Sequence, residues 1–190
     1  MHSMPAPSAL AISLRQRKYR DDLERRIVER LRTEARSDRA RTELARQTGI
    51  ADSQLLAELA DLGLTTRTMG ALRLIPLVRV AWADNHVDAQ ERQAVLTAAT
   101  SLGIHRGSDA YVMLERWLRE MPPAERIDAW ERYLKRVMEK LGKTAQLKLI
   151  QFLRAQMIAI AKASGGYFGF GKVSAKERQT IESFMNALSD

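Results

Sequence analysis

The chain has 190 residues, a formal net charge of +8 and a hydrophobic content of 45%. That length and apolar content suit one domain with a real core, alone or with an added arm, and they exclude disorder throughout. The chain contains no cysteine, which excludes disulfides, thiol chemistry and zinc–thiolate sites.

The residue types favour helices. Ala, Leu, Arg, Glu and Gln dominate the sequence, and all of them are good helix formers. Segments of alternating β-branched residues, which would indicate strands, are absent. We therefore expect an all-α fold, a bundle of about seven or eight helices.

The N-terminal third is predicted to be an arm. Residues 1–8 contain Pro5 and Pro7 and are expected to form a disordered lead-in, and residues 9–63 are expected to form a basic helical extension. The extension begins with a long helix that ends at Gly49. Its apolar residues recur every four positions: Tyr19, Leu23, Ile27, Leu31 and Ala35. Such a stripe has to pack on the protein's own core or on a partner.

The arm also carries most of the net charge. Between Arg15 and Arg46 there are twelve Arg or Lys against seven Asp or Glu, a surplus of +5 out of the +8. A basic arm can attract nucleic acid or an acidic membrane through counterion release. The alternative is a solvated helix, because the interleaved acids can pair with arginines at helical spacing.

Capping residues predict where the remaining helices begin. Asp52 is the predicted N-cap of a short leucine-rich helix that Gly63 ends, because its carboxylate can accept hydrogen bonds from the first turn. The following segment, residues 65–83, should be kinked or restarted at Pro76. Further helices are predicted over residues 88–103, 108–120, 122–141 and 144–163 and from 174 onward. Four of these helices begin at a predicted cap: Asp88, Ser108, Thr144 and Ser174.

One turn between helices has a distinctive pattern. A helix is expected to end at Asp84, and the next begins at Asp88. Asp88 and Glu91 have the spacing of a capping box, in which each side chain accepts a hydrogen bond from a backbone N–H near the other. Val87 can reach the core from the turn, and Asn85 tolerates the left-handed backbone angles that a tight turn needs.

This pattern resembles the loop of TerB-like (tellurite-resistance) domains, written A-D-G-x-[apolar]-[ST/D]-x-x-E. The match covers Asp84, Val87, Asp88 and Glu91, while Asn85 replaces the usual glycine. The resemblance implies a TerB-like helical domain over residues 64–190 and a role in the stress response.

The resemblance also implies a metal hypothesis. TerB-like proteins have been proposed to bind divalent metal at acidic residues, which points here to Asp84, Asp88 and Glu91 with Ca²⁺ or Mg²⁺. The alternative is that Asp88 and Glu91 act only as caps. An EF-hand loop counted from Asp84 would place Val95 at its twelfth position, and valine cannot replace the bidentate glutamate.

The same turn recurs near the C-terminus. Residues 87–93 and residues 173–179 share five of seven amino acids, and Ser174 and Glu177 stand where Asp88 and Glu91 stand. We interpret this as a pseudo-repeat of two helix–loop–helix units. Ser164 takes the place of Asp84, so any metal should prefer the first loop.

The glycine-rich segment from Gly166 to Gly171 approaches the Walker A spacing, yet Val173 stands where a Mg²⁺-binding hydroxyl is needed. A helix, not a strand, precedes the segment. Nucleotide binding is therefore not predicted. The glycines should instead allow a tight reversal, with Tyr167, Phe168 and Phe170 covering the core or forming a contact patch.

These patterns lead to a hypothesis for function. No nucleophile–base pair or cofactor motif stands out, and His2, His86 and His105 are too scattered to suggest zinc, so no enzyme activity and no certain cofactor are predicted. We expect a protein-interaction module that binds a protein partner or itself, with metal binding or nucleic-acid binding as alternatives.

The short apolar patch from Ala9 to Leu14 has no basic residue before it, unlike a secretory signal, and no apolar run is long enough to span a membrane. The expected location is the cytoplasm.

Overall fold

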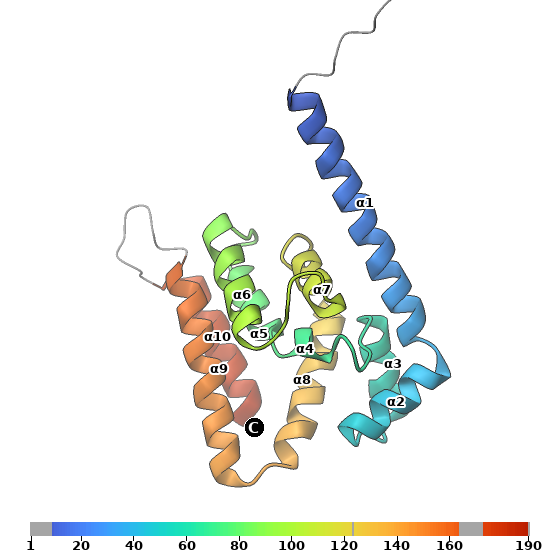
Figure 1. Ribbon diagram of the computed structural model, residues 1–190. Coiled ribbons are helices and arrows are strands. Elements are labelled where there is room, and N and C mark those ends of the chain that lie inside the picture. The colour runs from blue at the N-terminus through green and yellow to red at the C-terminus, as the bar shows by residue number, and fades with distance from the viewer. Residues whose placement is uncertain (1–8, 123, 164–172, 190) are drawn as a thin grey trace, which may run out of the picture.

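The computed structural model describes residues 9–122, 124–163 and 173–189, and within these ranges the chain forms ten helices and no strand. The helices are α1 (Ala9–Ala35), α2 (Asp38–Thr48), α3 (Ser53–Asp61), α4 (Met69–Leu72), α5 (Ile75–Ala81), α6 (Ala89–Ser101), α7 (Asp109–Trp117), α8 (Ala124–Glu139), α9 (Lys143–Ala163) and α10 (Ala175–Ser189) (Figure 1). The predicted all-α class is confirmed, with more helices than the seven or eight expected.

The prediction of one long arm helix ending at Gly49 is wrong, because the arm is divided into α1 and α2. Ser37 has an extended backbone, and its hydroxyl accepts a hydrogen bond from Ala40 N at 3.2 Å, which makes it the N-cap of α2. The same hydroxyl donates to the Glu34 carbonyl at 2.7 Å. Because the Ser37 hydroxyl bonds the backbone of the preceding turn and of the following turn, it ends one helix and begins the next. Gly49, with φ of 69°, ends α2 as predicted.

Most of the other predicted caps are confirmed. The side chains of Asp52, Asp88 and Ser108 each accept a hydrogen bond from the first turn of the following helix. Pro76 lies in the first turn of α5, so it begins a fresh helix. The prediction for Thr144 is wrong. Helix α9 begins at Lys143, and the Gly142 carbonyl accepts hydrogen bonds from the backbone N–H groups of its first turn.

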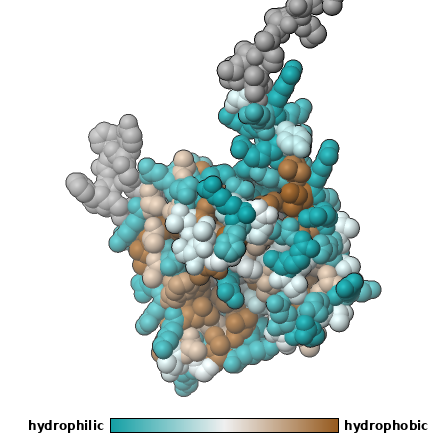
Figure 2. All heavy atoms as spheres, viewed as in Figure 1, coloured by the Kyte–Doolittle hydropathy of each residue, from teal (hydrophilic) through white to brown (hydrophobic). Residues whose placement is uncertain are grey.

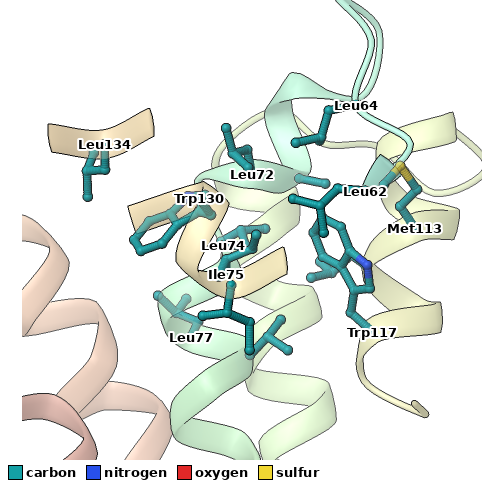
Figure 3. Packing of buried hydrophobic residues seen from close by; sticks show 14 of the residues in the cluster. Leu62, Leu64, Leu72, Leu74, Ile75, Leu77, Met113, Trp117, Trp130 and Leu134 are labelled. Atoms are coloured by element: carbon teal, nitrogen blue, oxygen red, sulfur yellow. The ribbon is translucent and has the colours of Figure 1, made fainter. Parts of the chain in front are cut away.

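One hydrophobic core connects the helices from α1 to α10. It contains Leu31 of α1, the leucines of α3, and Phe184 and Leu188 of α10. The indole of Trp130 stacks on the ring of Phe184 with 5.0 Å between the ring centroids. Figure 3 shows Trp130 of α8 beside Leu74 and Ile75. The predicted extension, residues 9–63, therefore shares its core with residues 64–190.

Four of the helices, α5, α6, α9 and α10, pack together around that core. On the other side, α3 packs on α8 and α1 packs on α7, while α8 contacts α10 and α7 contacts α6. Only the C-terminal half of α1 lies on the bundle, and its N-terminal half projects away (Figure 1). None of the described helices has the length and apolar character that a membrane crossing requires.

Candidate functional site

The first helix–loop–helix turn, between α5 and α6, has the geometry that its sequence predicts. One carboxylate oxygen of Asp88 accepts hydrogen bonds from Gln90 N and Glu91 N, both at 2.7 Å. In return, Glu91 Oε2 accepts a hydrogen bond from Asp88 N at 2.9 Å. Asn85 has φ of 66°, the left-handed conformation that the turn needs. The predicted capping box is confirmed.

The second turn repeats this arrangement at the start of α10. Ser174 N donates to Glu177 Oε2 at 2.6 Å, and Glu177 N donates to Ser174 Oγ at 3.2 Å. Glu177 is buried, as Glu91 is in the first turn. The pseudo-repeat therefore has a capping box in each copy. Residues 164–172, which include Ser164 and the glycine-rich loop, lie outside the described residues.

The two turns lie close together in the bundle. Lys176 Nζ of the second turn lies 3.6 Å from Asp84 Oδ1 of the first. Burial raises the pKa of Glu91 to about 7, and the negative charges of Asp88 and Glu177 act in the same direction. The hydrogen bond from Asp88 N opposes this rise. The turns thus place two buried glutamates near each other.

The three predicted metal ligands serve separate roles in this arrangement. Asp84 is exposed and forms an ion pair with Lys176, Asp88 caps α6, and Glu91 is buried against the backbone of Asp88. In the described part of the chain, no group of three or more His, Asp or Glu side chains is arranged to hold a metal ion. Metal binding at this turn stays an alternative hypothesis beside the capping role of Asp88 and Glu91.

The projecting half of α1 is the second candidate site. Large apolar side chains on it are open to solvent: Leu14 is 53% exposed, Tyr19 73% and Leu23 45%. Further along the same helix, Leu31 is only 1% exposed. The stripe predicted from Tyr19 to Ala35 therefore divides into an exposed half and a half that packs on the core.

Glu24 marks the point at which α1 leaves the bundle. It is buried, and both terminal nitrogens of the Arg119 guanidinium, which follows α7, donate to its carboxylate. Arg119 also donates to Asp21 Oδ1 at 3.2 Å. Sequence analysis missed this contact. Arg119 lies 95 residues from Glu24 along the chain, and no local pattern links such distant residues.

Comparisons with protein-family models, with curated proteins and with solved structures found no match to this chain. In the paired turns, Asp88 and Glu91 already serve as hydrogen-bond acceptors for backbone groups, which is a structural task. The projecting half of α1 offers apolar and cationic side chains to solvent, which is a surface suited to binding.

Proposed function

We propose that this chain is a non-catalytic, TerB-like protein-interaction module, and that the projecting half of α1 is its binding element. The observation that carries the proposal is the exposure of Leu14, Tyr19 and Leu23 on a helix whose continuation is buried. A helix that packs only half of its apolar stripe on its own core leaves the other half for a partner.

The charges around the stripe identify the kind of partner. Residues 13–20 contain Arg15, Arg17, Lys18 and Arg20 and no acid. Tyrosine and arginine are also enriched in protein interfaces. The complementary surface is an apolar groove with an acidic rim on another protein, into which an amphipathic helix can dock.

The paired turns support the TerB-like part of the proposal. Each helix–loop–helix unit has its own capping box, led by Asp88 in one and Ser174 in the other. The link to the stress response rests on the resemblance of the Asp84–Glu91 turn to TerB-like domains, and the interaction role does not depend on it.

The test is recovery of a partner from the protein's own cells with three versions of the full chain. Wild type and Leu147→Ser should recover the same acidic partner, while the double variant Tyr19→Ser/Leu23→Ser should lose it. Leu147 is the matched control because it is an exposed leucine, 60% accessible, on α9. A chain that remains a monomer and recovers no partner contradicts the proposal. Equal recovery by the double variant also contradicts it.

A second candidate function is nucleic-acid binding by the same half of α1. The observation in its favour is the run of four cations without an acid over residues 13–20. An electrostatic contact is strongest at low salt, so a gel shift with mixed-sequence duplex DNA and with RNA should appear there. The triple variant Arg15→Gln/Arg17→Gln/Lys18→Gln should lose it. No shift at low salt excludes this function.

A further inference from the structure

A cavity of about 770 Å³ opens on the bundle away from α1, where α2, α4, α8 and α9 meet. Helices α8 and α9 diverge from the short connection between them, and Figure 2 shows apolar surface gathered in the hollow that separates them. The cavity falls within the range of roughly 300–1,000 Å³ that is usual for small-molecule pockets. Sequence analysis missed it, because its walls come from segments far apart in the chain.

The lining of the cavity is divided into an apolar and a polar part. The apolar part comes from α8 and α9 and includes Trp130, Leu149 and Phe152. Phe152 is 44% exposed, although a side chain of its size is usually buried. The polar part comes from the C-terminal end of α2 and the residues before α4, with Thr48 and Thr66. A ligand that fits both parts is itself amphipathic.

The charge of the cavity is positive. Arg73 is its one charged lining residue. Its backbone N–H donates to the Ala71 carbonyl, but its guanidinium has no ion pair or hydrogen bond with any residue that the structure describes. Tyr133 lines the cavity beside it: burial raises the pKa of the Tyr133 hydroxyl, and the charge of Arg73 opposes that rise. At the polar part, Lys140 Nζ donates to the carbonyls of Thr48 and Gly49, at 3.1 and 3.0 Å.

We propose that this cavity binds a small amphiphile with a hydrocarbon body and one carboxylate. The body would pack on Leu149 and Phe152, and the carboxylate would accept hydrogen bonds from the Arg73 guanidinium and the Tyr133 hydroxyl. Arginine is suited to this task because its planar N–H groups match a carboxylate. The proposal uses no residue of α1 and is independent of the proposed interaction role.

Size and charge argue against two other occupants. One turn of a partner helix with its side chains fills about 500 Å³, so the cavity would admit less than two turns. The exposed half of α1 from a second copy is cationic, and it would bring Arg15, Arg17 and Lys18 toward Arg73 and Lys140. Like charges placed together oppose such docking.

The test compares decanoate, kept below its micelle-forming concentration, with decanol, its uncharged counterpart. Binding is followed by calorimetry and by tryptophan fluorescence, since Trp130 lines the cavity. Wild type should show saturable binding of decanoate. Arg73→Gln should bind decanoate about tenfold more weakly, with decanol unchanged, because one charge-assisted contact is lost. Arg106→Gln is the matched control, since it removes an exposed arginine outside the lining and should bind both probes like wild type.

Phe152→Ser tests the location of the site and should weaken both probes, with thermal unfolding measured to confirm that the variant folds. Three results would overturn the proposal. The first is no saturable binding of decanoate to wild type. The second is unchanged decanoate binding in either Arg73→Gln or Phe152→Ser. The third is that an acidic amphipathic helical peptide binds the cavity while decanoate does not, which would identify a helix-binding groove instead.

Discussion

The guanidinium of Arg119 donates two hydrogen bonds to the carboxylate of Glu24, and the one between Nη2 and Oε1 is 3.1 Å long. This bidentate pair joins the second residue after the end of α7 to the middle of α1 at the edge of the bundle. The α7 end is itself held by two other side chains. Trp82 Nε1 donates to the Trp117 carbonyl at 2.8 Å, and Arg92 donates to the Leu118 carbonyl at 3.1 Å.

We predict that Arg119→Ala lowers the free energy of unfolding by about 2 kcal/mol, because it leaves the buried Glu24 carboxylate without its partner. Denaturant unfolding measures the change. Arg25→Ala is the matched control, since Arg25 pairs with Asp22 at the protein surface, and it should cost less than about 0.5 kcal/mol. Equal losses in the two variants would contradict a special role for the Glu24 contact.

The two halves of α1 should respond differently to truncation of a leucine. Leu31→Ala should cost about 3 kcal/mol, because Leu31 is fully packed in the core. Leu14→Ala should change the free energy of unfolding by less than about 0.5 kcal/mol, because its side chain is exposed. Both values come from denaturant unfolding. A cost at Leu14 close to that at Leu31 would mean that the projecting half packs on something within the protein or on another copy.

Glu91 should make the protein less stable as the pH rises. Burial raises its pKa from 4.5 to about 7, so the folded protein holds the proton more tightly than the unfolded chain does. The contribution of protonated Glu91 to the free energy of unfolding is fully present below about pH 4.5 and is lost as the pH rises through about 7. The loss should be on the order of 2–3 kcal/mol.

Glu91→Gln isolates this effect, because glutamine can still accept the hydrogen bond from Asp88 N but does not titrate. Denaturant unfolding at several pH values should show a smaller fall for this variant than for wild type. Glu182→Gln, at an exposed position of α10, should keep the wild-type fall. Parallel curves for wild type and Glu91→Gln would show that this carboxyl has an ordinary pKa.

For the metal hypothesis, we predict that calorimetric titration with Ca²⁺ or Mg²⁺ gives no binding heat. Asp84 is paired with Lys176, while Asp88 and Glu91 accept hydrogen bonds from the backbone, so a metal would have to compete with these partners for the carboxylates. Asp84→Ala is the comparison variant. A saturable heat in wild type that disappears in Asp84→Ala would establish a metal site at this turn.

The features predicted well from the sequence are those that depend on residues three or four apart. The capping boxes of Asp88 and Ser174 are of this kind, since both partners lie in one turn. Ser37 was missed because the apolar stripe favours an uninterrupted helix. A stripe shows which side of a helix is buried but not that the chain has turned.

The features that could not be predicted depend on residues far apart in the chain. Neither Arg119 nor Glu24 differs from its charged neighbours until the fold brings them together. The same holds for Arg73 and Phe152, which line one cavity from the C-terminal end of α4 and from α9. Periodicity predicts that each helix has an inner and an outer face, but it does not indicate which helices leave a space between them.

Under the proposed interaction role, the projection of α1 would affect the rate at which a partner is captured. From Glu24 back to Ala9 the helix extends about 22 Å at 1.5 Å per residue. A partner that docks on α1 would therefore encounter its cationic end before it reaches the surface of the bundle. Association should slow as ionic strength rises, because salt screens this long-range attraction. Dissociation should depend mainly on how well Tyr19 and Leu23 are packed in the complex.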